Sequence, residues 1–162
     1  MTEFSPRTAL RSPRAMLDGY IILPRLIDKV RAYAQGVLPE VYHRNLLRPG
    51  VTLDGRFLAL TGLDGEALRQ VVLSSAVDEP VMQWIARYAR PHSEEEKQRW
   101  ASEVDGYRAS GRVLLYLQAT APELAARVDF SRFSLLDLID MDEGRLLIPP
   151  SDESAGERHL KF

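Results

Sequence analysis

The residues best suited to chemistry gather in the first third of the chain. Arginine presents a planar fork of donors that fits carboxylate or phosphate groups, and tyrosine and histidine add a hydroxyl or an imidazole to such a site. Together with the free amides at a helix start, these residue types could bind a small anionic ligand. The candidate ligand-binding residues are Arg11, Arg14, Tyr20, Arg25, Asp28, Lys29, Arg31, Tyr42 and His43.

The same residues allow a purely structural interpretation, because charge is unevenly distributed along the chain. The net charge is −2, yet positions 1–50 hold eight basic and four acidic residues. In a salt-bridged scaffold, Arg11 and Arg14 would pin the N-terminal segment to the acidic remainder. Non-specific nucleic-acid binders need a clear basic excess to neutralise phosphates. We therefore expect no nucleic-acid partner.

Several established chemistries are excluded by residue content and spacing. The chain has no cysteine, which excludes disulfides, thiolate metal sites and cysteine nucleophiles. It has no glycine-rich phosphate loop, dinucleotide fingerprint or nucleophile elbow. Its three histidines lack partners at zinc-like spacing, and the acidic run at 137–144 lacks the final glutamate of a calcium loop. We expect no metal site and no cofactor.

An enzymatic role stays open as an alternative to simple ligand binding. Asp28 or His43 would then act as the general base, with Tyr20 or Tyr42 as the acid. Arg14 and Arg25 would clamp the anionic substrate and stabilise charge that develops on it. Nothing in the local sequence pattern decides between an enzyme and a binding protein.

Protein partners fit the sequence better than membranes do. The N-terminus lacks the apolar core of a signal peptide, and the longest apolar stretches, such as Val113–Leu117, fall far short of the roughly 20 residues of a membrane span. We expect a soluble cytoplasmic protein that binds a protein partner or a small anionic ligand. A structural homodimer is a further alternative, with an apolar patch around Trp84, Tyr88 and Trp100 as its interface.

Apolar residues recur at three- and four-residue steps over much of the chain, which predicts an all-α bundle of about six or seven helices. The clearest helix begins near Leu23, has Pro24 in its first turn and ends at Gly36. We expect its opposite face to point to solvent. That face carries the charged residues Arg25, Asp28, Lys29 and Arg31.

Capping residues and breakers indicate the other elements. Ser12 before Pro13 predicts a short early helix, and residues 37–52 are expected to form a long loop. The apolar run 112–119 is compatible with a strand or a helix, and we assign a helix because isolated strands are unstable. Further helix starts are predicted at the capping residues Asp64, Asp78, Ser93 and Ser134.

The length of the chain, 162 residues, is that of one ordinary domain. A chain of this size buries about 68–70% of its unfolded surface and can fold on its core alone. We expect a single helical domain at 11–150, preceded by a flexible leader at 1–10 and followed by a polar tail at 151–162.

Short motifs in the first half of the chain resemble one known family. They are Arg11-Ser12-Pro13-Arg14, Gly19-Tyr20, Ile27-Asp28-Lys29 with Arg31, Leu53-Asp54, and Asp78-Glu79 followed by Trp84. As a set they resemble the bacterial domain-of-unknown-function family 5069, over roughly residues 10–90. The resemblance implies a compact helical bacterial domain, and it implies no particular reaction.

Overall fold

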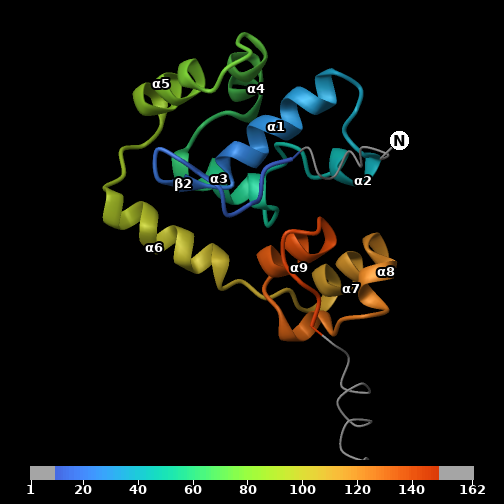
Figure 1. The fold of residues 1–162 in the computed structure, drawn as a ribbon. Coiled ribbons are helices and arrows are strands. Elements are labelled where there is room, and N and C mark those ends of the chain that lie inside the picture. The colour runs from blue at the N-terminus through green and yellow to red at the C-terminus, as the bar shows by residue number, and fades with distance from the viewer. Residues whose placement is uncertain (1–9, 150–162) are drawn as a thin grey trace, which may run out of the picture. The chain divides into compact units, whose positions relative to one another are not determined.

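The computed structural model describes residues 10–149, and their helical content confirms the predicted all-α class (Figure 1). This part of the chain holds nine α-helices, one short 3-10 helix and a two-stranded hairpin. Seven of the α-helices have eight residues or more, which agrees with the predicted number, and the other two are single turns. Residues 1–9 of the predicted leader and the whole predicted tail, 151–162, lie outside the described residues.

The elements follow one another in this order. The hairpin consists of β1 (Met16–Leu17) and β2 (Tyr20–Ile21). The α-helices are α1 (Leu23–Ala34), α2 (Glu40–His43), α3 (Leu53–Thr61), α4 (Gly65–Leu73), α5 (Glu79–Tyr88), α6 (Glu94–Asp105), α7 (Gly111–Thr120), α8 (Pro122–Ala125) and α9 (Leu135–Asp142). The 3-10 helix η2 (Phe130–Arg132) precedes α9.

Contacts divide the chain into two compact units, the first ending at Val104 and the second beginning at Asp105. In the first unit α1 packs against α4, and α4 packs against α5. In the second unit α7 packs against α8 and η2, around a small core of Leu124, Val128, Phe130, Leu138 and Met141. The single domain over residues 11–150 stays a prediction.

The short helix predicted at Ser12 and Pro13 is wrong. The amide of Ala15 donates to the Ser12 carbonyl at 3.0 Å, which closes a turn, and the chain then enters the antiparallel hairpin. Asp18 and Gly19 form the hairpin turn with φ of 50° and 79°. Asp-Gly pairs favour such turns because both central residues need a left-handed backbone. The preference of Asp18-Gly19 for a hairpin turn therefore determines the structure here, and Ser12 does not start a helix.

The helix predicted from Leu23 is confirmed as α1, with Pro24 in its first turn. Its apolar stripe lies in the core of the first unit. The predicted exposure of its opposite face is wrong, because Arg25 and Lys29 are only 3% and 6% exposed. Other segments thus surround α1 on more than one side, and its charged side chains need partners inside the fold.

The remaining helix predictions are confirmed in position, with two differences in extent. The predicted loop at 37–52 contains the single-turn helix α2, which follows Pro39 and has Glu40 in its favourable first turn. The helix that begins after Ser93 was expected to continue to Gly111, but it ends at Asp105, directly before Gly106. The apolar run 112–119 is helical, as predicted, and forms α7.

Gly55 in α3 lies too close to the backbone of residues 48–50 to accept a side chain. A Cβ at this position would lie 2.5 Å from the Gly50 carbonyl oxygen and 2.7 Å from that of Arg48. Alanine normally favours a helix over glycine by about 1 kcal/mol, yet we expect Gly55→Ala to lower the free energy of unfolding by about 1–3 kcal/mol in a urea titration. Gly65→Ala in α4 is the control, because its closest contact would be 3.3 Å. Equal losses in the two variants would contradict this explanation.

Candidate functional site

Arg11 connects the N-terminal segment to two different parts of the first unit. Its backbone amide and its Nε both donate to Asp28 Oδ2, at 2.8 and 3.0 Å, and its Nη2 donates to Asp28 Oδ1 at 3.0 Å. Its Nη1 donates to Asp78 Oδ2 at 2.8 Å. The hydrogen bond to Asp28 is the main cause that raises the pKa of the Arg11 guanidinium. This is the bonding expected of a salt-bridged scaffold.

Asp78 is shared between two arginines. Its second oxygen, Oδ1, accepts from Arg31 Nη1 at 2.8 Å, so the carboxylate bridges Arg11 and Arg31. Burial acts to raise the pKa of Asp78, but the hydrogen bonds and charges of the two arginines outweigh it, and the pKa lies below its ordinary value. Asp78 was predicted to cap a helix. It does precede α5, but its side chain makes no capping hydrogen bond, because both oxygens serve the arginines.

Lys29 is paired with Asp54 in the interior of the first unit. Lys29 Nζ lies 2.6 Å from Asp54 Oδ1, and the two side chains are 8% and 0% exposed. The other carboxylate oxygen accepts from the Leu47 amide at 2.9 Å. This pair joins α1 to α3 and to the segment before α3. Lys29 is therefore held by a buried carboxylate of its own chain.

Arg25 in α1 contacts Tyr42, one of the two candidate residues in the segment 37–52. Its Nη1 donates to the Arg11 carbonyl at 3.2 Å, and its guanidinium carbon lies 5.5 Å from the centre of the Tyr42 ring. His43 follows in α2, where its Nε2 lies 2.7 Å from the Leu38 carbonyl oxygen and its ring meets Tyr33 edge-on. Arg25 and Tyr42 thus share one site, whereas His43 has its own partners.

Tyr20 and Arg14 belong to the hairpin region. Tyr20 is buried edge-on against Phe57, and Lys97 Nζ lies 4.6 Å from the centre of its ring. Burial raises the pKa of the Tyr20 hydroxyl, and the nearby charge of Lys97 opposes that effect. Arg14 is half-buried in the turn, with its backbone amide donating to Ser12 Oγ at 3.1 Å. Catalysis through Asp28 or His43 stays a prediction.

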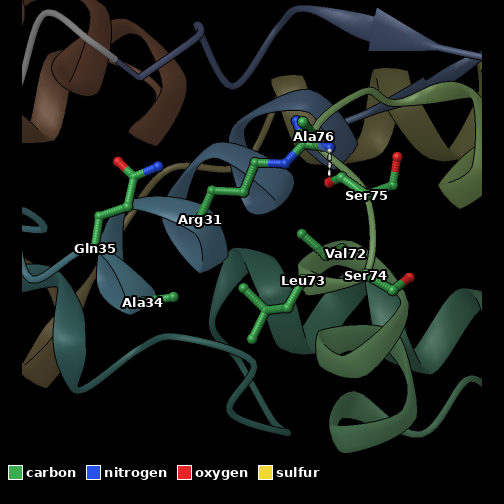
Figure 2. Close-up of a pocket in the computed structure, with 8 residues that line it drawn as sticks. All are labelled: Arg31, Ala34, Gln35, Val72, Leu73, Ser74, Ser75 and Ala76. Atoms are coloured by element: carbon green, nitrogen blue, oxygen red, sulfur yellow. Dashed lines mark hydrogen bonds between the residues drawn. The ribbon is translucent and has the colours of Figure 1, made fainter.

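A cavity of about 310 Å³ lies where α1 and α4 both end (Figure 2). Arg31 is the single candidate residue that lines it. Figure 2 shows its side chain running from α1 to the segment that follows α4. The complete lining consists of Arg31, Ala34, Gln35, Val72, Leu73, Ser74, Ser75 and Ala76.

The guanidinium of Arg31 has partners on two of its three nitrogens. Nη1 donates to Asp78, and Nη2 donates to the carbonyl oxygens of Ser75 and Val77 at 3.2 and 2.9 Å. Nε is buried and has no hydrogen-bond partner among residues 10–149. A buried donor without a partner costs about 1–3 kcal/mol. This nitrogen has almost no accessible surface, so it lies behind the cavity wall and not on it.

Sequence reasoning missed every cavity residue other than Arg31. The residues 72–76 read as the end of a helix followed by a polar connection, and nothing in their spacing marks a binding site. The cavity exists because the ends of α1 and α4 come together in space, which no local motif encodes. The two serines that follow α4, Ser74 and Ser75, are the one feature of the sequence that could have indicated a polar site here.

The residues of the predicted homodimer patch are not equally exposed. Trp100 packs against the first unit's core beside Phe57, and Trp84 packs partly on the same core. Tyr88 is 58% exposed and lies 5.4 Å, ring centre to ring centre, from Trp84. The homodimer itself stays a prediction.

Among residues 10–149, no group of three or more histidine or acidic side chains is placed to hold a metal ion. None of the described helices combines the length and the apolar character needed to cross a membrane.

The family model described as "Domain of unknown function (DUF5069)" matches residues 7–145. No curated protein matches the chain.

The shared carboxylate of Asp78 predicts a pH-dependent contribution to stability. Its pKa is lowered by folding, so its stabilisation is complete above the ordinary pKa of about 3.9 and is lost as the pH falls through the folded value. We expect Asp78→Asn to lower the free energy of unfolding by about 1.5–3 kcal/mol near neutral pH. The deficit should shrink in urea titrations below about pH 4.

Glu79→Gln is the matched control for that experiment. Glu79 is the neighbouring carboxylate but is exposed, and its side chain accepts only a weak bond from Gln83 at 3.4 Å. We expect this variant to unfold like the wild type. A deficit in Asp78→Asn that stays constant down to acid pH would contradict the proposed ionic role.

Proposed function

Because this chain belongs to the DUF5069 family, whose description assigns no activity, we propose a function from the geometry alone: the first unit binds a small organic acid in the cavity beside Arg31. The proposal keeps the small anionic ligand expected from the sequence. It moves the site from the surface of the N-terminal arginines to the place where α1 and α4 end. The observation that carries it is the cavity of about 310 Å³, which is lined by the partly exposed side chain of Arg31.

The bonding of the arginines favours this cavity over the originally expected face. Arg11 and Lys29 are paired with carboxylates of the same chain, so an external anion would have to displace those carboxylates. Arg31 is also paired, with Asp78, but it lines the cavity and its side chain is 21% exposed. A ligand carboxylate in the cavity would be attracted by the charge of Arg31 without displacing Asp78.

The number of available donors limits the kind of acid. Two nitrogens of Arg31 already serve Asp78 and backbone carbonyls, so the guanidinium cannot form the bidentate pair typical of phosphate recognition. Ser74 and Ser75 line the same cavity. The hydroxyl of Ser74 already donates to the Val71 carbonyl oxygen at 2.7 Å. The hydroxyl of Ser75 accepts from the Val77 amide at 3.3 Å and can donate its own proton to a carboxylate oxygen.

The size and lining of the cavity limit the rest of the ligand. A volume of about 310 Å³ is at the small end of ligand pockets. Leu73 and Ala76 provide exposed apolar surface, whereas Val72 is fully buried, so the ligand should carry a short aliphatic body. A compact branched or linear aliphatic acid satisfies both conditions.

The proposal is tested by closing the cavity without changing Arg31. Ala34 lines the cavity on an exposed position of α1, so Ala34→Trp should fill the space and leave the ion pairs intact. Calorimetric titrations would use a panel of short aliphatic monocarboxylates, with and without an amino group. We expect saturable binding of at least one panel member to the wild type and at least a tenfold loss of affinity in Ala34→Trp, about 1.4 kcal/mol.

Ala86→Trp provides the control, because Ala86 is an exposed residue of α5 that does not line the cavity. Its affinity should equal that of the wild type. Binding that survives in Ala34→Trp, or a panel in which no member binds the wild type, would overturn the proposed function.

A further inference from the structure

We propose that a second copy of this chain binds to the first unit through an uncharged surface formed by the ends of α1 and α4. This surface, called here the uncharged face, consists of the exposed residues within 32–39 and 70–77. The inference goes beyond the proposed function and does not depend on it. Because the cavity lies within this face, an acid bound in the cavity would lie between the two copies.

The two segments of the uncharged face contain no charged residue, although 27% of the chain is charged. Both segments line the same cavity, and Figure 2 shows them on different sides of it. Arg31 lies directly before the first segment and joins it to the second, because its Nη2 donates to the carbonyl oxygens of Ser75 and Val77. Depletion of charge distinguishes the centre of a protein interface from the rest of a protein surface.

The uncharged face also exposes large apolar side chains. Ten such side chains are exposed among residues 10–149, and four of them belong to these two short segments. Their exposed fractions lie between 44% and 61%, and they are Tyr33, Val37, Leu73 and Val77. Exposed apolar side chains that gather in one place mark an interaction site, because covering them removes apolar surface from water.

The charges that border the two segments make the uncharged face complementary to a copy of itself. Each segment begins directly after an arginine, Arg31 or Arg69, and ends directly before an acidic residue, Glu40 or Asp78. A twofold axis through the middle of the face sets the same surface of two copies together in opposite directions. The basic edge of one copy therefore meets the acidic edge of the other.

Charges of both signs are accessible at this border. Arg69 lies beside the face in space, because its guanidinium carbon is 5.7 Å from the centre of the Tyr33 ring, and its side chain is 26% exposed. The acidic Glu40 and Glu79 are exposed at the opposite ends of the two segments. A polar rim around an apolar centre is the usual arrangement of a protein interface. The net charge of −2 adds little repulsion between two copies.

Sedimentation equilibrium of the full chain tests the association directly. We expect the average mass to rise from that of one chain toward that of two chains as the concentration increases from about 1 to about 300 µM. A mass that stays at one chain over the whole range would overturn the inference. The titrations with monocarboxylates decide the proposed function separately, because they measure binding to the cavity whatever the oligomeric state.

A carboxylate placed on each segment tests whether the uncharged face is the interface. Val37 and Val77 are exposed and do not line the cavity, so Val37→Glu and Val77→Glu should leave the fold and the cavity intact. Each variant places a charge in an apolar contact and near its own copy across the twofold axis. We expect each to weaken the association of two copies at least tenfold, about 1.4 kcal/mol. Association that is as tight in both variants as in the wild type would overturn the inference.

Two control variants carry the same added charge elsewhere. Val51 is 70% exposed and lies outside the uncharged face, so Val51→Glu should associate as the wild type does. A loss in Val51→Glu equal to that in Val37→Glu would contradict the inference, because the charge of the whole chain would then control association. Tyr88→Glu alters the exposed aromatic residue of the homodimer patch predicted from the sequence. A loss in Tyr88→Glu with none in Val37→Glu would place the interface on that patch and not on the uncharged face.

Discussion

The carboxylate of Asp78 holds together three segments that are far apart in the sequence. One oxygen binds Arg11 in the N-terminal segment and the other binds Arg31 in α1, while Asp78 itself lies at the start of α5. Arg11 continues the chain of charges to Asp28. Two arginines and two aspartates thus form a neutral series in which each inner member is shared. Because no charge in this series lacks a partner, it can be half-buried without a large desolvation cost.

The same interactions determine the shape of the cavity. Arg31 binds Asp78 and the carbonyls of Ser75 and Val77, and so holds the connection between α4 and α5 against the end of α1. The segment that carries Ser74 and Ser75 is therefore fixed by a side chain that also lines the cavity. Arg31 is both a wall of the proposed site and the residue that positions the opposite wall. For this reason the proposed test alters Ala34 and leaves Arg31 unchanged.

The sequence allowed the positions of most helices to be predicted, because capping residues such as Ser93 and Ser134 and the apolar spacing of α1 are local signals. It also identified Arg11, Asp28, Lys29 and Arg31 as a set, but it did not include Asp54 or Asp78, with which they pair. What it could not provide was their partners: Lys29 and Asp54 are 25 positions apart, and Arg11 and Asp78 are 67 positions apart. Charged residues on a helix look exposed until the neighbouring segments are known, and for this reason the burial of Arg25 and Lys29 was not anticipated. The cavity was missed for the same reason, since it is formed by two helix ends that no motif connects.

The long separation between Arg11 and Asp78 also has a consequence for the time course of folding during synthesis. Arg11 leaves the ribosome 67 residues before Asp78 does, and at about 5–20 residues per second this is a delay of roughly 3–13 seconds. Throughout that interval Arg11 has Asp28, only 17 residues downstream, as its nearest native carboxylate. The N-terminal segment can therefore attach to α1 early, but its second anchor and the wall of the cavity form only when α5 has been made. The nascent first unit thus exists for several seconds as a partly assembled structure whose proposed binding site is still open.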